Sequence, residues 1–192
     1  MKNTFISTVK ENINRDGIEN LLNWLETTDF YTAAASSRYH NSFEGGLVSH
    51  SLNVYNLLKA SPNLNDYSDE SIAIVSLFHD FCKINYYEVS TRNVKNKSGI
   101  WEQVPYYKVS EKFPFGHGEK SVFIVNQFIK LSNEEALAIN WHMGGFDSRV
   151  RGGSFSIGEA YNLSKLALEL NIADMRATYI LENNNNNLNV IL

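Results

Sequence analysis

The stretch from Ser71 to Lys83 constrains this chain more than any other, because it places polar side chains at the end of an apolar helix. Its sequence, SIAIVSLFHDFCK, predicts a buried helix that ends in adjacent His79 and Asp80, with Lys83 one turn further on. A buried imidazole and a buried carboxylate are strongly destabilising when nothing pairs with them. A divalent metal ion satisfies both, because it binds a neutral imidazole nitrogen and an ionised carboxylate oxygen. The stretch therefore predicts a metal site if the rest of the chain supplies more ligands.

The bulk composition predicts one cytoplasmic domain. A chain of 192 residues is long enough to bury a single core. Its net charge of −4 argues against a broad surface for nucleic acid, so a long nucleic acid is not expected as a partner. The one cysteine, Cys82, excludes an intramolecular disulfide, and we expect it to be a packing residue rather than a catalytic thiol. The sequence has neither a signal peptide nor an apolar run of about 20 residues, so no membrane association is expected.

Hydrophobic periodicity predicts helices for most of the chain. Helices are expected within 5–28, with a break near Asp16-Gly17, and over about 47–60, 71–83, 119–130, 133–142 and 157–181. Residues 86–94 and 100–109 instead alternate and are rich in aromatic side chains, with a turn between them. The expected fold is all-α with a β-hairpin inserted at about 86–110. It forms a single domain over residues 1–182, followed by an asparagine-rich tail at 183–192.

The aromatic side chains of this hairpin permit two interpretations. They are Tyr86, Tyr87, Trp101, Tyr106 and Tyr107. Such rings can stack on a nucleobase. Alternation of this kind also fits a hairpin that packs one face on the helical body, and we favour packing.

Several histidines and aspartates lie on apolar helix faces or where a helix meets a loop. They are His50, His79, Asp80, His117, His142 and Asp174. Taken singly, a histidine on an apolar face is commonly an ordinary core residue, and an inward aspartate commonly caps a helix. Asp174 is expected in mid-helix, with no lysine or arginine one turn before it on that face. One shared metal site explains the whole set with fewer assumptions, and its mixed nitrogen and oxygen ligands suit Mn, Fe, Co, Ni, Zn or Mg.

The ordered set resembles the HD-domain superfamily of metal-dependent phosphohydrolases over about residues 40–180. His79-Asp80 followed by Lys83 looks like the family's His-Asp-x-x-Lys signature, and residues 44–52 look like its first ligand helix. Gly116-His117 and Trp141-His142 match the two additional histidines of binuclear members, and Ile172-Ala173-Asp174 matches the closing aspartate. The resemblance implies a compact helical bundle, the HD-domain fold.

The resemblance also implies two divalent metal ions and a ligand set for each. The first ion would be bound by His50, His79, Asp80 and Asp174. Asp80 would bridge to a second ion held by His117 and His142. The implied activity is that of a hydrolase: cleavage of a phosphate ester or anhydride of a nucleotide or related small molecule by a metal-activated hydroxide, with Asp80 and Lys83 as catalytic residues.

Substrate contacts are expected from residues around these ligands. The candidates are His40, Glu44, Lys83, Arg149 and Arg151. Alternatively, Lys83 only pairs with Asp80 and does not contact the substrate. The two arginines are alternatively solvated side chains of a loop. His40 is expected beside the ligands or the substrate rather than as a ligand, with a surface position as the alternative.

Two other functions are compatible with the same ligands. Some relatives with this ligand set are di-iron oxygenases, and ligand identity alone does not separate that chemistry from hydrolysis. A non-catalytic, metal-stabilised binding module is the third possibility, with the hairpin as its partner surface.

Overall fold

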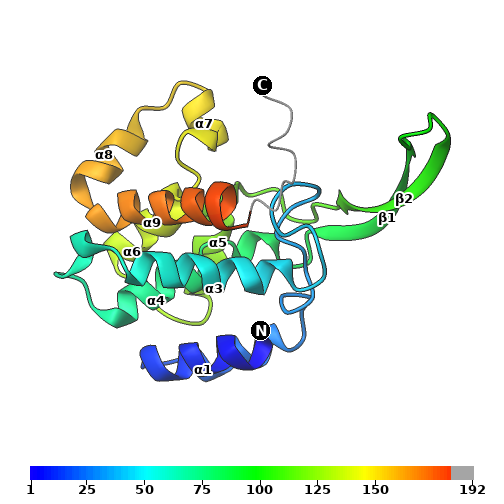
Figure 1. Ribbon diagram of the computed structural model, residues 1–192. Coiled ribbons are helices and arrows are strands. Elements are labelled where there is room, and N and C mark those ends of the chain that lie inside the picture. Colours follow the sequence, from blue (N-terminus) through cyan, green and yellow to red (C-terminus); the bar gives the residue numbers. More distant parts are fainter. Residues whose placement is uncertain (183–192) are drawn as a thin grey trace.

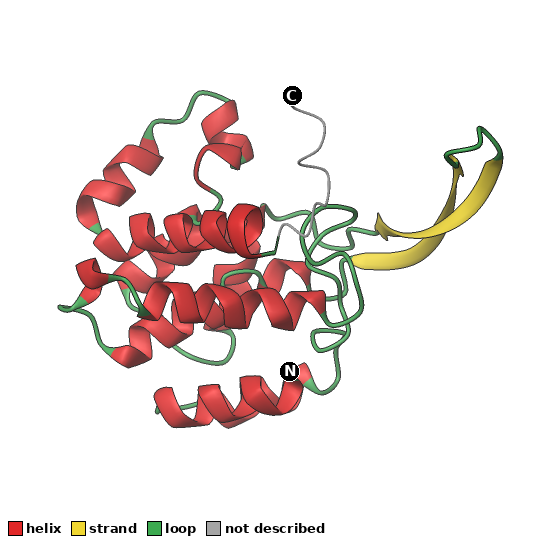
Figure 2. Ribbon diagram, in the orientation of Figure 1, coloured by secondary structure: helices red, strands yellow, loops and turns green. Residues whose placement is uncertain are grey.

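The computed structural model describes residues 1–182, so the predicted tail at 183–192 lies outside the described residues. The described chain is mostly helical, with one two-stranded antiparallel hairpin (Figure 1, Figure 2). The helices are α1 (Lys2–Asn12), α2 (Ile18–Leu25), α3 (Gly46–Lys59), α4 (Asp69–Phe78), α5 (His117–Asn126), α6 (Asn133–Trp141), α7 (Ser148–Arg151), α8 (Ser156–Leu163) and α9 (Lys165–Arg176), and the strands are β1 (Tyr87–Lys95) and β2 (Trp101–Val109). Among residues 1–182, none of these helices combines the length and the hydropathy that crossing a bilayer requires.

The predicted all-α fold with an inserted hairpin is confirmed, but one long helix expected over 157–181 is wrong. The chain breaks at Ser164, whose hydroxyl caps α9 by accepting a hydrogen bond from the backbone N–H of Ala167. The break turns Leu163 outward, where it is 73% exposed. The helix that carries Asp174 then continues as a π-helical segment over Ala177–Leu181.

The core holds the end of α4 in place through a group of packed aromatic rings. Phe78 and Phe81 lie on either side of the His79-Asp80 pair, and both are fully buried. The ring centroid of Phe81 lies 4.9 Å from that of Phe78 and 5.3 Å from that of Phe30. Full burial of each such ring contributes about 2–3 kcal/mol. The backbone that presents His79 and Asp80 is therefore anchored from both sides.

The hairpin projects away from the helical body instead of packing on it (Figure 1). Its strands pair from Tyr87 opposite Val109 to Lys95 opposite Trp101. Val89 is 75% exposed and Trp101 is 64% exposed. The expectation that one face of the hairpin packs on the body is therefore wrong. We call the hairpin, residues 87–109, the arm.

A buried ion pair ties the α1–α2 junction to the helices that carry the polar cluster. Arg15 binds both carboxylate oxygens of Glu135 at 2.7 Å. Glu135 belongs to the first turn of α6 and is fully buried. Arg15 also donates to Glu70 at the start of α4, with an Nε–Oε2 distance of 3.2 Å.

We expect Arg15→Ala to lower the free energy of unfolding by about 3 kcal/mol, because it leaves the Glu135 carboxylate buried without its cation. Urea denaturation measures this change. The matched control is Lys2→Ala, which breaks the exposed Lys2–Glu26 pair and is expected to cost less than about 1 kcal/mol. Equal losses for the two variants would contradict this interpretation.

Candidate metal centre

The six predicted ligand side chains meet in the interior between α3, α4, α5, α6 and α9. They are His50, His79, Asp80, His117, His142 and Asp174. The sequence places them in separate elements, and the fold brings their ligand atoms to within a few ångströms of one another.

The first group of ligand atoms surrounds the Nε2 atom of His50. This atom lies 3.3 Å from Nε2 of His79, 3.6 Å from Oδ2 of Asp80 and 3.2 Å from Oδ1 of Asp174. Metal–ligand bonds of about 2.1 Å at octahedral or tetrahedral angles put neighbouring ligand atoms about 3.0–3.4 Å apart. The spacing of these atoms is therefore that of a metal coordination shell.

The second group surrounds the other oxygen of Asp80. Oδ1 of Asp80 lies 2.9 Å from Nε2 of His117 and 3.5 Å from Nε2 of His142. One carboxylate thus turns Oδ2 to the first group and Oδ1 to the second. This is the arrangement that a bridging ligand requires.

Two of the histidines are oriented by the helix ends that precede them. His79 follows α4 and donates from Nδ1 to the carbonyl of Ser76 at 2.8 Å, and His142 follows α6 and donates to the carbonyl of Ile139 at 2.6 Å. These carbonyls belong to the last turns of their helices, where carbonyls lack helical partners. Because a carbonyl only accepts, Nδ1 carries a hydrogen, and in the neutral ring the lone pair is then on Nε2. Both rings therefore present the nitrogen that ligates a metal, in the tautomer that ligation needs.

The surroundings of His142 test whether a metal fits this site. Its Nε2 atom is buried and has no hydrogen-bond partner among the described residues. That lone pair faces an oxygen of Asp80, which is also an acceptor when ionised. Two facing acceptors repel each other, and a cation between them satisfies both. The residues present therefore fit a divalent metal ion.

Asp80 is kept ionised for this role. Burial alone raises the pKa of a carboxyl group, but the charge of Lys83 and the hydrogen bond with His117 hold the pKa of Asp80 well below its usual value. Asp80 stands at the N-cap of a 3-10 turn and makes no side-chain bond to its backbone. Its oxygens are therefore free to face the two groups of histidines.

Lys83 is buried beside the centre and pairs with Asp80. Its Nζ lies 2.6 Å from Oδ2 of Asp80, and its side chain is only 12% exposed. Burial lowers the pKa of a lysine, but Asp80 outweighs burial and raises the pKa of Lys83 above its usual value. The structure thus contains the Asp80 pairing, and it also places a permanent cation next to the ligand atoms.

A close approach of α5 and α6 brings His117 to the second group. A Cβ atom at Gly118 would lie 2.1 Å from the carbonyl oxygen of Asn140, so only glycine permits this helix contact. His117 is the first residue of α5, and its ring centroid lies 5.1 Å from that of His142. The glycine next to His117 therefore has a packing role that sets the position of a ligand.

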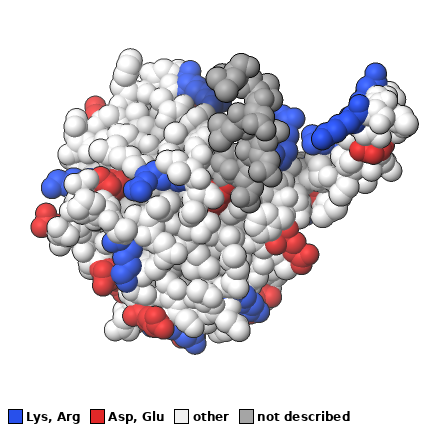
Figure 3. Space-filling model, viewed as in Figure 1, with Lys and Arg blue, Asp and Glu red and all other residues white. Residues whose placement is uncertain are grey.

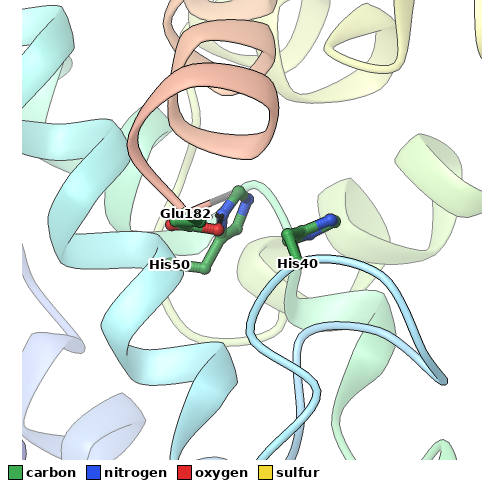
Figure 4. A group of neighbouring side chains, drawn as sticks. All are labelled: His40, His50 and Glu182. Carbon is green, nitrogen blue, oxygen red and sulfur yellow. Dashed lines mark hydrogen bonds and ion pairs between the residues drawn. The ribbon is translucent and has the colours of Figure 1, made fainter. Parts of the chain in front are cut away.

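Glu182 supports His50 from behind, and sequence reasoning missed it. Nδ1 of His50 lies 3.0 Å from Oε2 of Glu182 (Figure 4). Asn53 donates to Oε1 of the same carboxylate at 2.8 Å. A carboxylate behind a ligating histidine fixes its ring and raises its basicity. No periodic pattern marks Glu182, which directly precedes the asparagine run.

His40 lies next to this pair on the loop before α3 (Figure 4). Its ring centroid is 4.9 Å from that of His50, and its buried Nε2 atom has no hydrogen-bond partner within residues 1–182. Burial and the proximity of His50 lower the pKa of His40 to about 4. His40 is therefore a neutral neighbour of the first group and not a surface residue.

The remaining candidates for substrate contacts lie outside the two groups. Glu44 is exposed, and Arg151 is exposed with its guanidinium 5.5 Å from the ring centroid of Phe146. Arg149 is held by Asp147, Glu119 and Asn140 and lies over the ring of Trp141. Its guanidinium would have to exchange these partners to bind a phosphate.

Cys82 is buried, as expected for a packing residue. Burial and the charge of Asp80 raise the pKa of its thiol to about 12, which keeps the sulfur protonated at neutral pH.

Comparisons of the chain with protein-family models, with characterised proteins and with solved structures find no match. The functional interpretation therefore depends on the geometry of the site and on the order of its ligands in the sequence.

We expect metal affinity to rise with pH, because the metal must displace a proton from His50. Burial lowers the pKa of His50, but hydrogen bonds with Asp174 and Glu182 outweigh burial and raise it to about 10. In the metal-free protein His50 is therefore a positively charged imidazolium throughout pH 6.5–8.5. Metal binding must release one of its two ring protons, so each unit rise in pH should strengthen metal binding about tenfold. Isothermal titration calorimetry in buffers of different ionisation enthalpy measures both the affinity and the proton release. An affinity that is independent of pH would contradict this protonation state.

Glu182→Gln is expected to weaken metal binding about 10–100-fold, because it removes the carboxylate that orients His50. The matched control is Glu159→Gln, an exposed carboxylate on α8, which is expected to leave the affinity unchanged. Competition with a chromogenic chelator measures both variants. If they bind metal equally well, Glu182 has no role in the centre.

Proposed function

We propose that this protein is a metal-dependent phosphohydrolase of the HD-domain type, acting on a nucleotide or a related small phosphate ester or anhydride. One observation carries the proposal: the two oxygens of buried Asp80 face two separate groups of ligand atoms at 2.9–3.6 Å. The chain order of these ligands, with Lys83 after the His79-Asp80 pair, supports the same class. The helical bundle with its inserted hairpin is compatible with it.

The ligand groups define what each side chain would hold. His50, His79 and Asp174 would hold a first divalent ion, and His117 and His142 a second, with Asp80 shared between them. Two such ions would supply Lewis acidity toward a phosphoryl group and a nucleophile at neutral pH. Burial lowers the pKa of His79 to about 3, so this imidazole is neutral and ready to ligate.

The charges of the site favour an anionic substrate. Asp80, Asp174 and Glu182 contribute three negative charges, and Lys83 contributes one positive charge. Two dications would leave the loaded centre with an excess of two positive charges. Because few solvent molecules reach these buried groups to screen them, the excess would attract a phosphate strongly.

Lys83 is the residue of this chain best placed to bind a phosphate oxygen. Its ammonium pairs with Oδ2 of Asp80, the oxygen that faces the first ligand group. A metal at that oxygen would take over the neutralisation of Asp80 and leave Lys83 with unused donors. The ammonium would then orient a phosphoryl oxygen and offset its charge without leaving its buried position.

Asp80→Asn is expected to reduce metal content from about two ions per chain to less than one, because it weakens both ligand groups together. His117→Ala and His142→Ala should each retain about one ion, and Glu159→Gln should retain both. Inductively coupled plasma mass spectrometry of the purified proteins gives the ratios. If Asp80→Asn and His117→Ala lose the same single ion, Asp80 does not bridge.

The proposed activity is tested by hydrolysis of a panel of nucleotides and of bis-p-nitrophenyl phosphate. His79→Ala and Asp80→Ala are expected to lower the rate at least about 100-fold, since each removes a metal ligand. The assay is repeated without oxygen, where an unchanged rate is expected for a hydrolase. A wild-type rate in either variant would contradict the proposal, and so would turnover that requires oxygen.

A further inference from the structure

The arm has one face without any carboxylate. Successive side chains of a strand point to opposite faces, and the pairing of Tyr87 with Val109 fixes which residues share a face. On one face, β1 contributes every second residue from Tyr87 to Lys95, and β2 contributes every second residue from Trp101 to Val109. We call this the Tyr87 face. Glu88 and Glu102, the only acidic residues of the two strands, both lie on the opposite face.

The arm is also a positive element on a negative protein. The arm contains four lysines or arginines and two glutamates. The rest of the chain contains 13 lysines or arginines and 19 aspartates or glutamates. Positive side chains run along the arm to its tip (Figure 3). The net charge of the whole chain therefore conceals a local surface that suits an anionic ligand.

The Tyr87 face combines aromatic rings with a cation. At the tip, Nζ of Lys95 lies 5.3 Å from the ring centroid of Trp101, whose side chain is 64% exposed. At the base, the ring centroids of Tyr87 and Tyr107 lie 6.4 Å apart. An exposed ring beside a cation, two half-buried tyrosines and no carboxylate form a surface on which a base can stack and a phosphate can pair, as in proteins that bind single-stranded nucleic acid.

The same face begins a short way along the chain from the candidate metal centre. β1 starts four residues after Lys83, whose ammonium pairs with Asp80 at 2.6 Å, and Tyr87 at the start of the strand is half-buried. From Tyr87 to Lys95 the strand extends about 26 Å at about 3.3 Å per residue. A single-stranded nucleic acid with about 3.4 Å between stacked bases would place up to about eight nucleotides along this length.

We propose that the Tyr87 face of the arm binds a short single-stranded oligonucleotide. One phosphodiester linkage of the bound oligonucleotide then lies at the metal centre. The inference rests on the proposed function and narrows its substrate class. In the reaction, a water oxygen bonds to phosphorus and one P–O bond to a sugar oxygen breaks. A proton of the water ends on that sugar oxygen, so the products are a phosphomonoester and an alcohol.

Binding is tested without cleavage, on the full chain with EDTA in the buffer. The probe is a fluorescein-labelled oligothymidylate of twelve nucleotides. Its binding is measured by fluorescence anisotropy at low salt. Trp101→Ala and Lys95→Gln are expected to weaken binding about tenfold, since each removes a stacking or a phosphate contact. The matched controls on the opposite face are Tyr106→Ala and Lys108→Gln, which are expected to change binding less than twofold.

Three results would overturn the assignment of the arm: no binding of the oligonucleotide, equal effects on both faces, or a dimer in sedimentation analysis that Trp101→Ala dissociates. The last result would make the arm a contact between copies of this chain.

A separate measurement on the metal-loaded protein distinguishes this inference from the proposed function. The value of kcat/KM should rise from a dinucleotide to an octanucleotide in the wild type and stay level in Trp101→Ala. Hydrolysis that does not depend on length would overturn the role of the arm alone. Face-specific binding with no hydrolysis at any length would overturn the proposed function and the delivery of a linkage to the metal centre.

Discussion

The ionised carboxylate of Asp80, buried among histidines, is the constraint on which the rest of this structure depends. It lies within 3.6 Å of imidazole nitrogens from four helices or their ends. In the metal-free protein the ammonium of Lys83 offsets its charge at 2.6 Å. A buried carboxylate that faces imidazole lone pairs is a costly arrangement, and bound metal ions would convert it into a stabilising one.

The fold prepares this arrangement by rigid means. Helix ends set the tautomers of His79 and His142, packed aromatic rings anchor the backbone around Asp80, and a glycine lets α5 approach α6. Each device fixes the direction of a ligand before any metal arrives. Preorganisation of this kind lowers the free-energy cost of assembling a charged site.

Sequence reasoning found the six candidate ligands because each is a histidine or aspartate on an apolar helix face or where a helix meets a loop, and it found the hairpin from its alternation. It failed where the deciding contacts are tertiary. The break at Ser164 depends on a local cap that competes with the helical periodicity of its neighbours. The role of Glu182 depends on a contact with His50 of α3, 132 positions away in the sequence. Whether the arm packs on the helical body or projects from it is likewise a tertiary property that alternation does not predict (Figure 1). The net negative charge of the whole chain likewise hid the local excess of positive charge on the arm.

The central claim is that Asp80 joins two metal ions, and a crystal structure of the metal-loaded protein with anomalous scattering tests it most directly. The account predicts two anomalous peaks, one on each side of the Asp80 carboxylate. The first should lie among His50, His79 and Asp174, and the second between His117 and His142. A single peak, or two peaks that Asp80 does not contact, would contradict the account.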